Sequence, residues 1–228
     1  MIVEVTMNTR QTTDRVASRL QQRNGETCLR PEFQHVIDLV DPGSRVLDLG
    51  CGEGYLLKAL QTQKRARVQG IELSDMAIQA CVEKGLFVYH GDLDEGLADF
   101  NDQSVDYVIL TSTIQVLHRP DFLINEAARV GRKCIISVPN FAYWRVRSQL
   151  LLTGMMPKTA KLPYEWYNSP NIHLTTIKDF RKFCQDNSLQ ILDETALVLG
   201  ELSSRRVRLF PNFFADYAIF LVQRANAS

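Results

Sequence analysis

Short apolar runs alternate with amphipathic stretches along most of the 228-residue chain. Apolar runs of about five residues bounded by turn residues predict buried strands, and apolar positions three or four apart predict helices. Strands are predicted at 45–49, 68–71, 87–89, 106–110, 134–138, 189–198 and 218–222. Helices are predicted at 32–40, 55–60, 75–84, 122–129 and 177–186. This alternation predicts a Rossmann-like α/β sandwich with a mostly parallel sheet and an antiparallel hairpin of the last two strands at one edge.

Two regions do not follow this alternation. Residues 1–28 are polar, with little apolar periodicity, and are expected to form a flexible or loosely helical lead-in. Residues 141–175, which we call the aromatic segment, are rich in aromatic residues and proline and lack a clean period. We expect one domain over 29–228 that carries this segment as an insertion. The loop before the last strand holds Arg205, Arg206 and Arg208.

A glycine-rich loop, Gly50-Cys51-Gly52-Glu53-Gly54, follows the first strand and opens a helix. Glycines permit a tight turn and a close approach of a ligand to the backbone. The spacing is G-x-G-x-G rather than the G-x-G-x-x-G of dinucleotide sites, and no phosphate-binding G-x-x-x-x-G-K-[ST] motif is present. Asp48 and Glu53 are unfavourable neighbours for a pyrophosphate. The loop therefore suits a cationic ligand with a ribose, or serves only as a turn.

Acids also follow the next two strands. Glu72 ends the second strand, 22 residues after Gly50, where a carboxylate accepts hydrogen bonds from ribose hydroxyls. Asp92 follows the third strand and is placed to receive an exocyclic amine. The alternatives are a solvated strand end for Glu72 and, for Asp92, membership of an acidic loop.

The glycine loop and these acids resemble the S-adenosylmethionine site of class I methyltransferases over residues 44–138. The resemblance implies S-adenosyl-L-methionine or S-adenosyl-L-homocysteine as the cofactor, without a metal. It assigns to the cofactor Asp48, Gly50, Cys51, Gly52, Gly54, Glu72, Leu73, Asp92, Leu93 and Thr111. Cys51 is expected to be a small filler between glycines rather than a nucleophile.

No catalytic residue follows from the sequence. The fourth strand ends in Thr111-Ser112-Thr113 rather than in the N/D-P-P-Y motif of amino-group methyltransferases, and no Pro-Cys pair supplies a nucleophile for cytosine. His118 and His173 are each a candidate base or an ordinary loop residue.

The aromatic segment contains the runs P-N-F-A-Y-W, M-P-K-T, L-P-Y-E-W-Y and P-N-I-H-L. With Asp92 to Leu97 and Pro120, these runs resemble the MetW family of methionine biosynthesis proteins over about residues 30–198. The resemblance implies a cytoplasmic protein that supports a MetX-type homoserine O-acyltransferase, without an established methyl acceptor. The lead-in and the tail after residue 198 depart from the family pattern. An active small-molecule methyltransferase is the alternative.

Aromatic and basic residues of the same segment are the candidates for contact with a substrate or partner. Aromatic residues and arginine dominate the centres of interfaces, although the same aromatic side chains are equally suited to closing over a cofactor pocket. Arg145 and Arg147 either hold a carboxylate or are solvated. With the two histidines, the candidates are His118, Trp144, Arg145, Arg147, Tyr164, Trp166, Tyr167 and His173.

Composition limits the remaining classes. Lys plus Arg and Asp plus Glu each number 26, so the chain is not a generally basic nucleic-acid binder. Five cysteines without a C-x-x-C pair fit a reducing cytosol better than a disulfide or zinc framework. No signal peptide or membrane span is predicted. Although the net charge is zero, the charges are segregated along the chain. Residues 91–104 contain five acidic and no basic residues, and residues 127–164 contain seven basic and no acidic residues.

Overall fold

The computed structural model describes residues 30–159 and 164–225. The predicted lead-in at 1–28 lies outside these residues. The strands are β1 (Arg45–Leu49), β2 (Arg67–Glu72), β3 (Val88–His90), β4 (Val105–Leu110), β5 (Gly131–Pro139), β6 (Leu189–Leu199), β7 (Ser204–Arg206) and β8 (Tyr217–Arg224). The helices are α2 (Phe33–Leu39), α3 (Tyr55–Lys64), α4 (Asp75–Glu83), α5 (Pro120–Val130), α6 (Trp144–Thr153), α7 (Ile177–Asp186) and α8 (Pro211–Phe214). Two 3₁₀ turns, η1 (Leu93–Glu95) and η2 (Ile114–Val116), follow β3 and β4.

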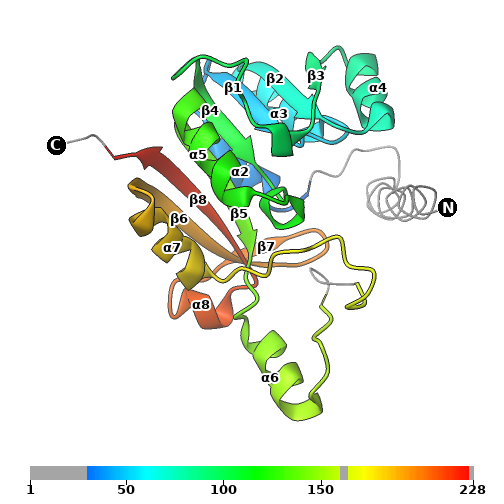
Figure 1. Ribbon diagram of the computed structural model, residues 1–228, viewed down its shortest axis with the longest axis vertical. Helices are drawn as coiled ribbons and strands as arrows, with labels where there is room; N and C mark the ends of the chain where they lie inside the picture. Colours follow the sequence, from blue (N-terminus) through cyan, green and yellow to red (C-terminus); the bar gives the residue numbers. More distant parts are fainter. Residues whose placement is uncertain (1–29, 160–163, 226–228) are drawn as a thin grey trace.

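All eight strands form one sheet in the order β3-β2-β1-β4-β5-β8-β6-β7 (Figure 1). Strands β1 to β5 are parallel, whereas β8 runs antiparallel to both β5 and β6. The predicted Rossmann-like α/β fold with a mostly parallel sheet and antiparallel C-terminal strands is therefore confirmed. Within that arrangement, β8 lies inside the sheet between β5 and β6 rather than at the edge.

Part of the predicted arginine loop is instead an edge strand. Arg205 and Arg206 belong to β7 and pair with Val198 and Leu197 of β6. Charged side chains are common on such strands because they oppose edge-to-edge association. Three polar residues carry no apolar alternation, so the sequence pattern did not predict a strand here.

The core lies on both faces of the sheet. On one face, α5 and α7 pack against the strands through side chains such as Leu123 and Phe180. On the other face, α2 and α3 contribute residues such as Ile37 and Leu60. Alternate residues of the strands serve the two faces: in β1, Val46 belongs to the second cluster and Leu47 to the first. Among the described residues, no helix is both long and apolar enough to cross a membrane.

Helix α6 is an exception to the two-layer packing. It projects from the body of the molecule beyond the end of β5 (Figure 1), and Val146 is its buried residue. The aromatic segment lacks a clean period, so no helix was predicted there, and α6 adds one. Its apolar residues Leu150, Leu151 and Leu152 are consecutive, so they cannot all face the sheet, and the helical period was hidden.

Candidate functional site

The carboxyl ends of the parallel strands meet at one edge of the sheet, and the glycine loop lies there, between β1 and α3. The backbone N–H groups of Gly50 and Cys51 both donate to the Ile71 carbonyl, at 2.8 and 3.2 Å. Gly50, Gly52 and Gly54 have φ angles of +76°, +53° and +76°. Residues with a Cβ rarely adopt this left-handed region, so glycine is required by the backbone itself.

Close packing adds to this requirement at Gly54. A Cβ on Gly54 would lie 2.5 Å from Leu86 Cδ1 and 2.7 Å from Cys81 Sγ. The Cys81 thiol donates to the Gly52 carbonyl at 3.2 Å. A hydrogen bond with Cys81, together with burial, raises the pKa of the Cys51 thiol. The raised pKa keeps the Cys51 thiol neutral, and its role as a small packing residue stays a prediction.

Glu72 braces the loop from β2. Its Oε2 accepts a hydrogen bond from the Gly52 N–H at 2.8 Å. Its Oε1 accepts from the N–H groups of Leu73 and Ser74, at 2.9 and 3.0 Å. Each carboxylate oxygen has two lone pairs, so Glu72 is held in one orientation and retains capacity for further donors. Leu73 is exposed beside it.

Asp48 is buried without a full set of partners. It is 1% exposed, and its Oδ1 has no hydrogen-bond partner among the described residues. Burial, and then the charge of Glu72, raise the pKa of Asp48 to about 7, while Arg30 acts in the opposite direction. An unpaired buried carboxylate is costly, so this position favours a cationic ligand or a proton.

Arg30 was not predicted as a site residue. Its Nη1 lies 3.6 Å from Oε1 of the buried Glu32, whose Oε2 has no partner in the described part of the chain. The Arg30 charge acts on both Asp48 and Tyr217. Arg30 precedes the first predicted helix and belongs to no motif, so only the tertiary structure associates it with the strand edge.

Hydroxyl groups join β4, β5 and β8 at the same edge. The Tyr217 hydroxyl lies 2.6 Å from Ser137 Oγ and 3.0 Å from Ser112 Oγ. Thr113 Oγ1 donates to the Leu49 carbonyl at 2.9 Å, and Thr111 is buried. Ser112 has a φ of +57°, an unusual conformation for a residue with a Cβ. These bonds fix the loop after β4 against the glycine loop.

Asp92 and Leu93 follow β3. Asp92 Oδ1 accepts from the Asp94 N–H at 3.0 Å and caps η1. Leu93 is buried, and its Cδ1 would lie 3.8 Å from a Cβ on Gly50. Asp92 is exposed, so its other oxygen is open to a ligand or to solvent.

The two candidate histidines lie in different settings. His118 is exposed, and its backbone N–H donates to Asp94 Oδ1 at 3.0 Å. The His173 N–H donates to the Gln115 carbonyl at 3.2 Å, which brings His173 to the loop after β4. The side-chain Nε2 of His173 is buried without a partner among the described residues.

Most of the aromatic and basic candidates stay near the surface. Trp166 is 77% exposed, and Tyr167 packs edge-to-face against it at 5.6 Å between ring centroids. The Arg145 guanidinium lies 5.4 Å from the Trp144 ring. Arg147 Nε donates to the Ala142 carbonyl at 2.6 Å, so part of its guanidinium is already bound. Tyr164 is half-buried.

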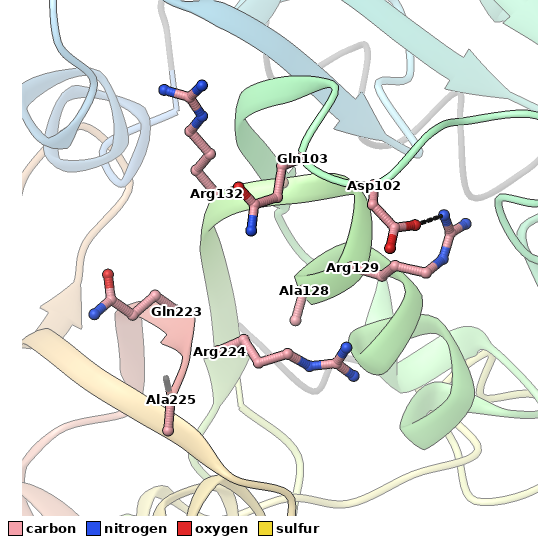
Figure 2. A pocket seen from close by; sticks show the side chains of 9 residues that line it. Asp102, Gln103, Ala128, Arg129, Arg132, Gln223, Arg224 and Ala225 are labelled. Carbon is pink, nitrogen blue, oxygen red and sulfur yellow. Dashed lines mark hydrogen bonds and ion pairs between the residues drawn. The ribbon is translucent and has the colours of Figure 1, made fainter. Parts of the chain in front are cut away.

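A cavity of about 540 Å³ lies away from this edge, lined by residues at the start of β5 and the end of β8 (Figure 2). Because β5 is parallel to β1, the start of β5 marks the opposite edge of the sheet. Arg129 and Asp102 pair there at 2.7 Å, and Arg224 extends toward them. The cavity is therefore not part of the glycine-loop site. No cluster of metal-binding side chains was found within 30–159 and 164–225.

Comparisons with known proteins show what this chain is similar to. The family model described as "Methionine biosynthesis protein MetW" matches residues 30–222. A relative from Rhodopirellula baltica, named bifunctional methionine biosynthesis protein MetXA/MetW, is 34% identical over 210 residues, or 88% of this chain. A ubiquinone biosynthesis O-methyltransferase from Hahella chejuensis is 30% identical over 106 residues, or 42% of this chain. The matches span 34% and 44% of these relatives' own lengths.

Solved structures show the same fold. A Thermotoga maritima S-adenosylmethionine-dependent methyltransferase, described as a possible histamine N-methyltransferase, matches with a TM-score of 0.62 and 14% identity, over 85% of this chain and 87% of that one. A chain in the complex of the Haloferax volcanii Trm112 methyltransferase activator with a putative methyltransferase matches with a TM-score of 0.61 and 19% identity, over 87% and 91%. At such identities the likeness establishes the fold alone.

Proposed function

Because this chain belongs to the MetW family of methionine biosynthesis proteins, we propose that it binds S-adenosylmethionine or S-adenosylhomocysteine and supports or regulates a MetX-type homoserine O-acyltransferase. The ligand reports the state of methionine metabolism, and the acyltransferase is the enzyme that responds. The observation that carries the ligand part is the buried carboxylate of Asp48 beside the glycine loop, whose Oδ1 has no hydrogen-bond partner in the described part of the chain.

The residues at the strand edge fit such a ligand. Its methionine part carries an ammonium group, which supplies the donor that Asp48 Oδ1 lacks. Its carboxylate suits the Arg30 guanidinium, whose charge already acts on Asp48. Its ribose hydroxyls suit the oriented Glu72 carboxylate. Leu73 and Asp92 then flank the adenine, and the glycines leave room for the ligand against the backbone.

The acyltransferase as partner rests on a relative and on a surface. The Rhodopirellula baltica relative carries both names, MetXA and MetW, on one chain. In this chain, α6 leaves Leu151 and Leu152 85% and 81% exposed, with Met155 and Trp166 also exposed on the same segment. Exposed apolar side chains in such number mark an interaction surface. We therefore assign the acyltransferase to the aromatic segment, with Arg145 beside Trp144 at the polar rim.

An active methyltransferase on a small-molecule acceptor is the second candidate. The observation in its favour is the 30% sequence identity to a ubiquinone biosynthesis O-methyltransferase over 106 residues. A positioned acceptor is the main requirement for transfer from a sulfonium, so the lack of an assigned base does not exclude it.

Two measurements test the proposal. Calorimetry should detect binding of S-adenosylmethionine or S-adenosylhomocysteine, and Glu72→Ala should weaken it by on the order of 1–3 kcal/mol because the variant removes the proposed acceptor for the ribose hydroxyls. The acyltransferase from the same organism should co-purify with the chain, and its activity should change on addition of the chain. An acyltransferase that neither associates nor changes in activity would contradict the partner role. Labelled methyl appearing in a small molecule of a cell extract would favour the second candidate.

A further inference from the structure

Two polar atoms without partners lie on neighbouring segments beyond the end of β4. Gln115, in η2, is 8% exposed; its Nε2 donates to the Ser112 carbonyl at 2.9 Å. Its Oε1 has no hydrogen-bond partner within the described residues, and neither does the buried Nε2 of His173. An unsatisfied buried polar group is destabilising, and these two belong to residues whose backbones are hydrogen-bonded to each other, which points to a ligand as their missing partner.

The backbone holds these two residues together. The N–H groups of Ile172 and His173 both donate to the Gln115 carbonyl, at 2.9 and 3.2 Å. The Phe141 N–H donates to the Thr175 carbonyl at 3.0 Å, which joins the returning end of the aromatic segment to its start. Residues 172–175 therefore form a strap from η2 to the end of β5, at the edge of the sheet that also carries the glycine loop.

The chemistry of the two atoms restricts what they bind. An amide oxygen only accepts hydrogen bonds, so the ligand must present an N–H or O–H donor to Gln115. A neutral imidazole nitrogen either donates or accepts, depending on the tautomer. A hydroxyl can donate to Gln115 or accept from His173, and an amine can donate to either atom. A carboxylate or a phosphate has no donor for Gln115.

We propose that Gln115 and His173 form a subsite for the hydroxyl or amino group of a small polar second ligand. The proposal deepens the proposed function, because it names the chemistry of a molecule that binds beside the S-adenosyl ligand. It applies whether that molecule is a methyl acceptor or an effector. His173 thus anchors the strap through its backbone and contacts the ligand through its ring.

Nitrogen NMR of the full chain labelled at histidine tests the subsite directly. The chain has four histidines, and His173→Phe identifies the signal of His173. Ethanolamine and L-homoserine serve as probes, and propionate serves as the anionic control. With S-adenosylhomocysteine at saturation, at least one of the two probes should shift the ring nitrogens of His173, and propionate should not. Absence of a shift with both probes at about 10 mM, or an equal shift with propionate, would overturn the proposal.

Variants separate this subsite from the S-adenosyl site. Gln115→Leu should weaken binding of the probe at least tenfold and keep the affinity for S-adenosylhomocysteine within threefold of that of the wild type. Ile172→Val is the matched control, because it keeps the strap and its backbone bonds, and it should bind the probe as the wild type does. A large loss of S-adenosylhomocysteine affinity in both Gln115→Leu and His173→Phe would assign the pair to the cofactor and overturn the subsite. If the wild type does not bind S-adenosylhomocysteine, the proposed function fails, and the same probe titration without it still decides on the subsite.

Discussion

Helices α3 and α6 each have ten residues, and each follows a parallel strand at the same edge of the sheet. They differ in how many of their side chains are buried. Helix α3 buries Leu56, Leu57, Ala59 and Leu60, whereas α6 buries Val146. The apolar residues of α3 recur with the helical period, so one face fits the sheet. Those of α6 are Trp144, Val146 and one run of three leucines at 150–152. The difference indicates that α3 serves the fold and the glycine loop, while α6 carries the exposed apolar surface that we propose for the partner.

Near the glycine loop that precedes α3, removing the charge of Asp48 should change the free energy of unfolding most. The pKa of Asp48 is raised to about 7 in the folded chain, against about 4 in an unfolded chain, so the folded state binds the proton more tightly. Protonated Asp48 contributes up to about 4 kcal/mol to the free energy of unfolding. This contribution is complete below pH 4 and is lost as the pH rises to about 7. Asp48→Asn should flatten this dependence. Denaturant unfolding at pH 4 to 8 measures it, and equal slopes in the two proteins would contradict it.

The same group links ligand binding to pH. An ammonium group beside Asp48 lowers its pKa, so binding of an S-adenosyl ligand should release a proton below pH 7 and strengthen as the pH rises toward 7. Asp48→Asn should bind more weakly and lose this pH dependence. Calorimetry in buffers of different ionisation enthalpy counts the proton. A wild type that releases none would show that the ammonium does not face Asp48.

Adding a methyl group to the loop should have the next largest effect. Gly54→Ala combines a left-handed φ of +76° with contacts of 2.5 Å to Leu86 and 2.7 Å to Cys81. We expect a loss of about 2–4 kcal/mol from backbone strain and overpacking together. Gly43→Ala is the matched control, since it has the same φ and no atom within 4 Å. Thermal unfolding of both variants isolates the packing contribution, and equal losses would show that there is none.

The start of α7 should respond more weakly. Thr176 Oγ1 accepts from the Asp179 N–H at 3.1 Å, and Asp179 Oδ2 accepts from the Thr176 N–H at 3.2 Å, which forms a capping box. Thr176→Ala should cost about 1 kcal/mol. Helix α6 has no side-chain cap, so Tyr143→Phe tests loss of the aromatic hydroxyl without loss of a cap. Denaturant midpoints compare the two, and an unchanged midpoint in Thr176→Ala would exclude a role of the box in stability.

Removing the leucines of α6 should affect stability least. Leu151→Ser combined with Leu152→Ser changes exposed side chains, so the free energy of unfolding should stay within about 0.5 kcal/mol of the wild type. Leu57→Ala, in the buried face of α3, should cost about 2–5 kcal/mol. Association with the acyltransferase should fall at least tenfold in the double variant and persist in folded Leu57→Ala. A destabilised double variant that still associates would assign α6 to the fold.

The distribution of charge along the sequence differs from the pairing of charges in the folded structure. The acids of 91–104 and the bases of 127–164 are segregated in the sequence. In space, Arg129 pairs with Asp102 at 2.7 Å and with Glu126 at 2.8 Å. Asp94 is bound by the N–H groups of His118 and Arg119. Several of these charges therefore already have partners within the fold.

Patterns within the sequence were sufficient to predict the mostly parallel sheet, the glycine loop and the family. Local periodicity determines which residues are buried, and a left-handed turn requires glycine wherever the chain folds, so neighbouring residues carry this information. The tertiary structure alone decided the strand position of Arg205, the projection of α6, the action of the Arg30 charge on Asp48, and the backbone hydrogen bond from His173 to Gln115. Each depends on contacts between residues far apart in the chain, whose partners no local spacing specifies.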